Sequence, residues 1–587
     1  MAKVFQQTFF NGQWVDYGAS VTSVAPPNGP DLPVEIRLDL PFNVPTRRRM
    51  EDSPYGVGAH YFLSFPIAIT SDYTKDVDTR LNADGTPMDP ADYRLRWLPK
   101  GSIEGGFDNR TVGGLFRDYH ALRRAKRTPI SSPTKAGLTL TWQIQDKMWE
   151  VREAIRAGHD YFFLDILQVP QSAGDMPLRW IQTLQLFDAV AEVQRQDNVS
   201  FKIICMPDGT TSGTKNPTTL IDALKYLITT YPDVVYMEEG EFLLAPYQPE
   251  GGTAGLQLSG LSAYNFWDTV IKGVQGAGKG CKFWPCYQKD WTATGQHPTL
   301  QDLCYGVMIW GDRDKVAVRN DSNARARRAY YYLRTHFPKS QKWCHYIAPG
   351  DQRPRETDSA TGGSRWWEQD HLETLIGCWE AAIGDTTAVD ANGELLHRHA
   401  DMTQLTTWSD MAENAHHAPS HNHGRTILMI DTYYTIKFKT GEFPKIERDC
   451  LILSHRNQPT DNEPTTTVTY PADTLQTKYM KAPTGSTPEQ NTVALACFLT
   501  APARVYLNRG GVEYDMGTLP AGFTHGLTVP IAPIGDGTTS AYAVRDGKTV
   551  AILQPSADPL FKIRTTVTTT QDYTYKMRDN LSLPVKP

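Results

Sequence analysis

The sequence predicts an α/β fold: a (β/α)₈ TIM barrel, preceded by a short β-rich arm and followed by an antiparallel β-sandwich. Continuous apolar runs alternate with segments of helical periodicity between about residues 55 and 455, which is typical of buried parallel strands and their connecting helices. Polar residues follow many of these runs. The composition then shifts to Thr and Pro at 459–473, and short Val- and Thr-rich runs continue to residue 587, as they do in a β-sandwich.

We expect three domains, at 1–50, 51–458 and 459–587. In the first, the segment TFF-Asn11-Gly12-QWV places an Asn-Gly turn between β-forming residues, which indicates a hairpin. A single hairpin is too small to fold alone. We therefore expect this arm to dock on the barrel or on another protein, such as a virion tail protein.

Within residues 51–458 we expect eight strands, with helices between most of them. The strands are expected at Ala59–Ile67, Tyr161–Leu167, Phe201–Met206, Val234–Met237, Lys282–Pro285, Val307–Trp310, Trp343–Ile347 and Leu405–Trp408. The helices are expected at 147–158, 177–196, 217–231, 262–275, 323–336, 366–383 and 424–441. About 400 residues is long for this fold but permitted when insertions are present.

Composition and charge exclude several classes of protein. A net charge of −6 and a pI of about 6.2 give no electrostatic case for nucleic-acid binding. No segment reaches the ~18 apolar residues of a membrane-spanning helix, and the N-terminal MAKVFQQTFF lacks the apolar region of a signal peptide. The eight cysteines are scattered without a CxxC motif, so we expect buried free thiols rather than disulfides or a zinc site.

Polar and aromatic residues gather where the predicted strands end, which is where barrel enzymes carry their chemistry. Each acid alone could cap the next helix. Together with the 14 Trp and 27 Tyr of the chain, the acids favour a carbohydrate cleft, in which aromatic rings stack on sugars. The residues predicted to bind substrate are His60, Asp165, Asp208, Glu239, Trp284, Tyr287, Trp310, Trp408 and His416.

The segment Thr406–Gly424 carries the candidate catalytic groups. Asp410 and Glu413 lie three positions apart, directly behind Trp408. Glycoside hydrolysis uses one protonated and one ionised carboxyl, and this pair can supply both. The alternative is a solvated loop whose aspartate caps a helix.

Four histidines follow in the same segment, at 416, 417, 421 and 423. Imidazoles can bind a transition metal, but no carboxylate or cysteine has matching spacing. We therefore expect hydrogen-bonding roles for them, and no metal, nucleotide or redox cofactor. The Gly-rich segment 273–280 imitates a phosphate-binding loop, but it lacks the final Ser or Thr and precedes a strand instead of a helix. We interpret it as a turn.

At these motifs the chain resembles glycoside hydrolase family 71, the α-1,3-glucanases or mutanases. The segment WSDMAENAH (408–416) is similar to the family's Trp-Asn-Asp-x-x-Glu-Ser-His motif. Other similar segments, in order, are AHYFLSF (59–65), AGHDYFFLDI (157–166), SFKIICMPD (200–208), YMEEGE (236–241), FWPCY (283–287), QDHL (369–372) and YYTIKFKTGEFPKI (433–446). The resemblance covers about residues 55–455.

The resemblance implies that Asp410 and Glu413 are the catalytic carboxylates of an inverting enzyme, and that Asp370 is a further active-site acid. The chain departs from the family pattern, which usually has Asn, Ser, His and Asn, at Ser409, Asn414, Ala415 and Asp165. These departures bear on the substrate more than on the type of reaction.

Two functions follow from these observations. The first is a hydrolase that cleaves an α-linked cell-wall or capsular polysaccharide with Asp410 and Glu413. The second is a phage tail-tip or minor tail protein that binds a host surface glycan through a degenerate or accessory barrel. The N-terminus without a leader and the β-rich arm favour it. A tail-associated depolymerase satisfies both, so we expect action at the bacterial cell surface from a virion tail or by another leaderless route.

Overall fold

The computed structural model of the protein describes much of the predicted barrel and of the region after it. The described residues are 7–10, 13–16, 40–63, 130–133, 139–140, 142–173, 175–250, 261–276, 278–287, 300–310, 342–352, 366–367, 369–384, 399–410, 415–419, 423–456, 459, 491–531, 535–555, 561, 563, 565 and 575–581.

Eight parallel strands of the described chain form a closed ring. They are β3 (Gly56–Tyr61), β6 (Tyr161–Ile166), β7 (Lys202–Pro207), β9 (Glu241–Leu244), the interrupted strand β10 (Cys281–Phe283) and β11 (Cys286–Tyr287), β12 (Gly306–Ile309), β13 (Lys342–Ile347) and β16 (Met402–Leu405). The last strand, β16, pairs with the first, β3. The row continues through β6, β7 and β9 on one side and through β13 and β12 on the other.

The interrupted strand joins the two ends of this row. The backbone N–H of Trp284 donates to the carbonyl of Leu244 in β9 (2.8 Å), and that of Met308 in β12 donates to the carbonyl of Pro285 (3.0 Å). With helices outside the ring, this arrangement confirms the predicted α/β class and is TIM-like.

Apolar side chains cover both faces of the ring, as the continuous apolar runs predict. Outward residues such as Val57 and Phe162 pack in the main core with the surrounding helices. Inward residues such as Phe163 and Met206 form a smaller core inside the ring. Gly58 makes room for the ring of Tyr161 in this inner core, since a Cβ at position 58 would lie 2.1 Å from it.

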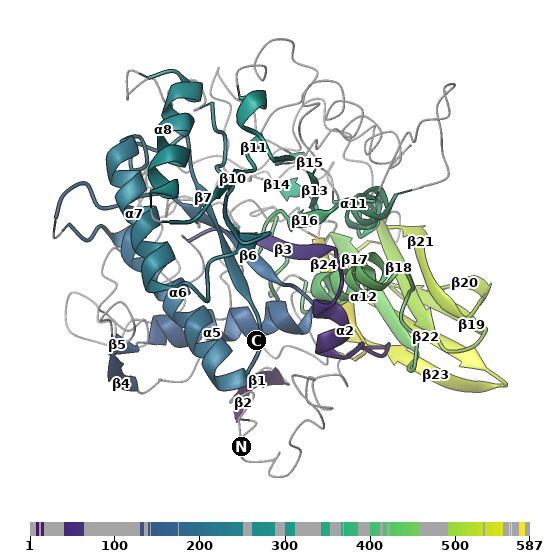
Figure 1. Ribbon diagram of the computed structural model, residues 1–587. Helices are drawn as coiled ribbons and strands as arrows, with labels where there is room; N and C mark the ends of the chain where they lie inside the picture. Colours follow the sequence, from purple (N-terminus) through teal and green to yellow (C-terminus); the bar gives the residue numbers. More distant parts are fainter. Residues whose placement is uncertain are drawn as a thin grey trace, which may run out of the picture.

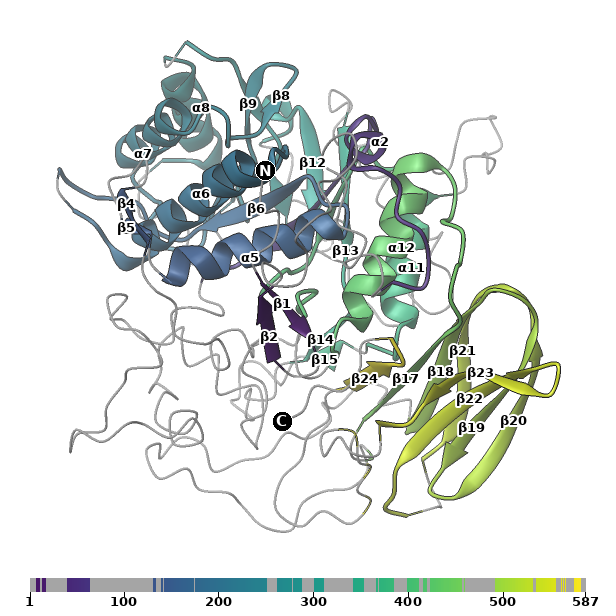
Figure 2. The same ribbon diagram turned by 90° about the horizontal axis from the view of Figure 1, so that it is seen from below.

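The long helices lie outside the ring: α5, α6, α7 and α8 cover one side, and α11 and α12 lie between the ring and the C-terminal strands (Figures 1 and 2). Their bounds are α5 (Trp142–Arg156), α6 (Leu178–Asp197), α7 (Pro217–Thr230), α8 (Ala263–Gln275), α11 (Glu373–Ile383) and α12 (Thr426–Thr440). α7 begins with a side-chain cap, because Asn216 accepts a hydrogen bond from the N–H of Thr218 and Pro217 follows at the first helical position.

Two four-stranded antiparallel sheets follow the ring. One contains β17 (Cys450–Arg456), β18 (Thr492–Leu499), β21 (Gly522–Pro530) and β24 (Tyr575–Asp579), and the other β19 (Ala503–Arg509), β20 (Val512–Leu519), β22 (Thr539–Arg545) and β23 (Lys548–Leu553). Buried residues of both sheets, for example Leu495 and Val505, belong to one hydrophobic cluster. The first of these strands, β17, begins before residue 459, where we expected the C-terminal region to start.

Several short elements complete the described chain. They are β1 (Gln7–Phe10), β2 (Gln13–Asp16), α2 (Arg47–Glu51), β4 (Ile130–Pro133), β5 (Thr139–Leu140), β8 (Met237–Glu238), a 3₁₀ helix (Gln301–Leu303), β14 (Asp351–Gln352) and β15 (Trp366–Trp367). β1 pairs antiparallel with β2, which confirms the expected hairpin. Its turn residues, 11 and 12, lie outside the described residues.

Two predicted elements differ from the structure. The fourth strand position is shared by two segments. Val235 bridges Ile203 of β7 in parallel, within the predicted Val234–Met237. The chain then reverses at Glu239 and Gly240, both with positive φ, and β9 continues the pairing with β7 and pairs with β10. The helix expected at 366–383 begins at Glu373. The helix expected at 323–336 lies outside the described residues.

All eight cysteines are free, and all but Cys281 are buried, which confirms the expectation of buried thiols. Among the described helices, none combines the length and the apolar character that crossing a membrane requires.

Candidate active site

Three neighbouring strands bring polar side chains to one end of the ring. His60, Asp165 and Asp208 occupy inward positions at the carboxyl ends of β3, β6 and β7, which are adjacent in the sheet. All three side chains are buried, with at most 5% of the residue surface exposed. Because parallel strands end at the same edge of a sheet, their acids meet where barrel enzymes carry their chemistry.

Asp410 joins this group through hydrogen bonds between the loop after β16 and the end of β3. The N–H of Trp408 donates to the carbonyl of His60 (2.7 Å). The hydroxyl of Ser409 accepts from the N–H of Phe62 (3.2 Å) and donates to its carbonyl (3.0 Å). Asp410 then follows with its own N–H bonded to the hydroxyl of Thr407 (2.8 Å) and only 7% of its surface exposed.

A buried histidine, His417, connects the same loop to α12 and β13. The imidazole of His417 bonds the carboxylate of Asp431 in α12 (2.7 Å) and the carbonyl of Ile347 at the end of β13 (3.1 Å). The N–H of His417 donates to the carbonyl of Thr407 (2.9 Å), and the indole of Trp379 also donates to Asp431 (2.9 Å). The loop is therefore anchored to a helix and to two strands, and His417 serves structure rather than chemistry.

Burial raises the pKa of two of these acids, Asp165 and Asp208. Burial, and then the charges of Asp208 and Asp410, raise the pKa of Asp165 well above its usual value, against the opposing charge of Arg179. Burial also raises the pKa of Asp208, although two hydrogen bonds from Thr210 to its Oδ1, both 2.7 Å, favour the ionised form. Of these two acids, Asp165 is the one that has no such donors.

His60 and Asp165 face each other without forming an ion pair. Nε2 of His60 lies 3.7 Å from Oδ2 of Asp165, too far for a hydrogen bond. Burial lowers the pKa of His60 to about 3, so the imidazole is neutral. Both ring nitrogens of His60 and Oδ1 of Asp165 are buried without a hydrogen-bond partner in the part of the chain that the structure describes. Buried polar atoms of this kind are uncommon, so they mark a candidate position for a bound polar group.

Two aromatic rings border these acids. The indole of Trp310 packs edge-on against His60, with ring centroids 4.5 Å apart, and lies 4.7 Å from the ring of Tyr247. Tyr247 follows β9 at an inward position and was not among the predicted residues. Sequence reasoning missed it because the fourth strand was predicted to end at Met237; the run Phe242–Ala245, read as its continuation, would have shown it.

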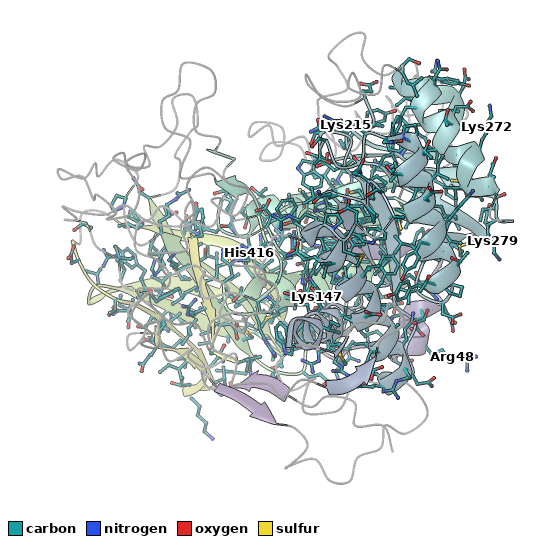
Figure 3. All side chains as sticks on the ribbon, turned by 90° about the vertical axis from the view of Figure 1, so that its left-hand side faces the viewer. Arg48, Lys147, Lys215, Lys272, Lys279 and His416 are labelled. Carbon is teal, nitrogen blue, oxygen red and sulfur yellow. The ribbon has the colours of Figure 1, made fainter. Side chains whose placement is uncertain are left out.

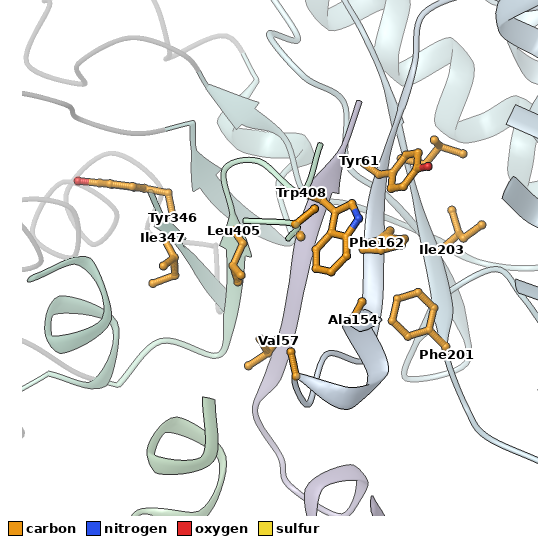
Figure 4. Close-up of a cluster of buried hydrophobic side chains, with 14 of the residues drawn as sticks. Val57, Tyr61, Ala154, Phe162, Phe201, Ile203, Tyr346, Ile347, Leu405 and Trp408 are labelled. Atoms are coloured by element: carbon orange, nitrogen blue, oxygen red, sulfur yellow. The ribbon is translucent and has the colours of Figure 1, made fainter. Parts of the chain in front are cut away.

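Other predicted aromatic residues belong to the core. Trp408 is fully buried and packs against Phe162, with ring centroids 5.4 Å apart (Figure 4). Trp284 is buried inside the ring, beside Tyr305 and against the backbone of Gly306 at the amino end of β12. Tyr287 is buried too. None of the three indole or phenol rings is placed to stack on a bound sugar.

Glu239 lies at the opposite end of the ring, so its predicted role as a strand-end acid was wrong. It occupies the turn before β9 and forms an exposed ion pair with Lys282 at the amino end of the neighbouring strand. The error has the same cause as the early end predicted for the fourth strand: the chain turns back at this point instead of ending a strand.

The remaining predicted residues are divided between the barrel and its boundary. Asp370 is buried in the loop that leads to α11, and its neighbour His371 bonds Ser454 (3.1 Å) and Thr492 (2.9 Å) of the C-terminal sheet. His416 is buried with its ring stacked 4.9 Å from that of His423. Glu413 and His421 lie outside the described residues. Within the described residues, no group of three or more His, Cys, Asp or Glu is arranged to hold a metal ion.

No family model matches the chain, and no curated protein matches it. Several solved structures are similar at low identity. The GH99 endo-alpha-mannosidase from Bacteroides thetaiotaomicron is 12% identical, with 53% of this chain and 84% of that chain covered and a TM-score of 0.35. A glycoside hydrolase family 5 protein from Bacteroides vulgatus is 11% identical (65% and 82% covered, TM-score 0.30). A GH27 β-L-arabinopyranosidase from Geobacillus stearothermophilus is 9% identical (75% and 94% covered, TM-score 0.29). A likeness at these scores fixes neither family nor activity, so the residues of the site itself decide its chemistry.

Proposed function

We propose that this protein is a glycoside hydrolase that cleaves an α-linked polysaccharide, with Asp410 and Glu413 as its catalytic carboxyls. The fixed position of Asp410 supports this most directly. Trp408 and Ser409 tie it to the end of β3, and its charge acts on Asp165. Glu413 follows three positions later in the same loop.

The environment suits acid/base catalysis. Burial and like charges separate the pKa values of neighbouring carboxyls, which lets one act as acid and another as base. We propose that Glu413 is the acid and Asp410 the base of an inverting reaction, for which the two groups need about 6.5–9.5 Å between them to leave room for water. The resemblance to family 71 favours an α-1,3-glucan-like substrate, with Asp370 as an additional acid.

Product release from a panel of bacterial and fungal wall glycans tests this proposal. We expect the native chain to release soluble oligosaccharide from one glycan. Asp410→Asn and Glu413→Gln should each lower kcat by about 10²-fold or more, because each removes an acid/base group. Asp268→Asn is the matched control: it makes the same change in α8, where Asp268 pairs with Lys272 (2.6 Å). Figure 3 shows Lys272 on the outside of the molecule. Full activity in either active-site variant would contradict the assignment.

A second candidate is glycan binding by a virion tail protein without cleavage. The hairpin β1–β2 favours it, because in the described chain these strands pair only with each other, and strand edges can add to a sheet of another protein. Tight binding of one glycan by the native chain and by Glu413→Gln, with no product from either, would replace the hydrolase with this candidate.

A further inference from the structure

Among the described residues, three acids lie at the carboxyl end of the ring around β3, β6 and β7. The negative charges of Asp208, at the end of β7, and of Asp410, in the loop after β16, disfavour the ionised form of Asp165. His60 faces it from β3 and is neutral. Two cations oppose this charge: Arg179 of α6 acts on Asp165, and Lys215 acts on Asp208.

Neither of these cations forms an ion pair with Asp165. Arg179 donates to Gln182 within its own helix (3.0 Å), and no ion pair with Asp165 is formed. Lys215 lies in the loop between β7 and α7 and acts on the acid of that loop, Asp208. Asp165 therefore has two like charges around it and no cation in direct contact among the described residues.

The buried atoms around Asp165 point to a ligand. Oδ1 of Asp165 and both nitrogens of His60 lack hydrogen-bond partners in the described chain. The ring of Trp310 packs against the imidazole of His60, and the ring of Tyr247 packs against that of Trp310. A buried carboxyl without a hydrogen-bond partner, acted on by the charges of two further acids and lying in the same site as aromatic faces, is a group that attracts a cation.

We propose that this end of the ring recognises a sugar bearing a free amino group, with the carboxylate of Asp165 as the partner of the ligand's ammonium. The glycan substrate is then one that contains de-N-acetylated hexosamine. Uronic acids and other anionic sugars are disfavoured by the charges of Asp208 and Asp410. The inference rests on the proposed hydrolase for its role in catalysis, but the binding step stands without it.

Binding of such a sugar displaces a proton. Burial and its two acidic neighbours raise the pKa of Asp165 well above its usual value, so the free protein favours the protonated form of this acid. When the ammonium arrives, the carboxylate pairs with it and the proton leaves to the buffer. A neutral sugar brings no charge to replace the proton, so its binding leaves Asp165 protonated.

Isothermal titration calorimetry of matched ligands tests the proposal. The ligands are α-linked trisaccharides of glucosamine, of N-acetylglucosamine and of glucose, and the protein is the Glu413→Gln chain, in which cleavage does not interfere. Near pH 6 we expect the glucosamine ligand to bind about tenfold or more tightly than the other two, the scale of one charge-assisted hydrogen bond. Measured in buffers of different ionisation enthalpy, its binding should release up to about one proton per ligand.

Asp165→Asn in the same background should remove both the preference and the proton release, whereas Asp268→Asn should change neither. Equal binding of the three ligands, or a preference without proton release, would overturn the proposal. Cleavage of a neutral glucan with no preference for the amino sugar would leave the hydrolase standing and remove this inference. Selective binding of the amino sugar by a native chain that cleaves nothing would do the reverse.

Discussion

Trp408 shows how the surroundings of a single residue decide its role. Its place before Asp410 and Glu413 predicted a sugar-stacking indole, yet its ring lies in the core beside Phe162 and His159. Strand order indicates at which end of a barrel a residue lies, but not whether neighbouring strands close over it. The same limit applies to Trp284. His60, Asp165 and Asp208 were predicted at the correct end because each lies near the end of a predicted parallel strand.

Trp408→Ala should therefore act on stability. Removing a buried indole loses the free energy gained by burying its atoms and leaves a cavity. Together these lower the free energy of unfolding by about 3–5 kcal/mol. Urea unfolding monitored by circular dichroism measures this loss, and Trp408→Phe should show a smaller one. An unchanged midpoint with lost glycan binding would show instead that the indole contacts the ligand.

At the scale of elements, the seam between β16 and β3 positions the candidate site. The first and last strands of the ring are far apart in sequence, and the hydroxyl of Ser409 adds two hydrogen bonds to Phe62 just beyond their pairing. The sequence predicted that both strands exist and that the site follows β16. It could not predict this seam, because hydrogen bonds between distant loops leave no periodic pattern.

Ser409→Ala should lower activity more than stability. It removes both hydrogen bonds between Ser409 and Phe62, at about 0.5–1.5 kcal/mol each, and frees the loop that carries Asp410. A displacement of about 1 Å at a reacting group can cost 10²-fold in rate, so we expect kcat to fall about tenfold to 10²-fold. Ser262→Ala is the control, since this hydroxyl caps α8 on the outer surface. If both variants kept native kcat, the seam would have no part in positioning Asp410.

At the scale of the whole molecule, the ring and the C-terminal sheets share contacts along α11 and α12. The ring of Tyr433 in α12 packs against Phe498 and Phe523 of the C-terminal sheet, with centroids 5.0 and 5.4 Å apart. His525 of β21 bonds the carboxylate of Glu373 in α11 (2.8 Å). Composition predicted the order of these regions along the chain, but not these contacts, which depend on which helix faces which sheet.

The His525–Glu373 contact makes stability depend on pH. The hydrogen bond to Glu373, and then the charges of Glu373 and Glu380, raise the pKa of His525 against the effect of burial. A raised pKa in the folded state adds stability that is complete below the unfolded value of about 6.5 and is lost as the pH rises through the folded value. Because the pair is partly exposed, the loss should be no more than about 1 kcal/mol.

Thermal unfolding of the native chain and of His525→Gln between pH 5.5 and about 8.5 measures this contribution. We expect the native midpoint to fall relative to that of the variant as the pH rises through the folded pKa. Parallel curves for the two proteins would show that this contact does not couple protonation to folding.

The acids near Asp165 also predict which residue a mutant library would retain at this position under different screens. The raised pKa of Asp165 works against the folded state at neutral pH, because the unfolded chain ionises this acid freely, and an amide of the same shape does not titrate. A library screened only for survival at high temperature should therefore accumulate Asp165→Asn, and one screened for use of an amino-sugar glycan should retain the acid. The frequencies of Asp and Asn at position 165 in the two libraries would then show that thermal stability and substrate preference conflict at this residue.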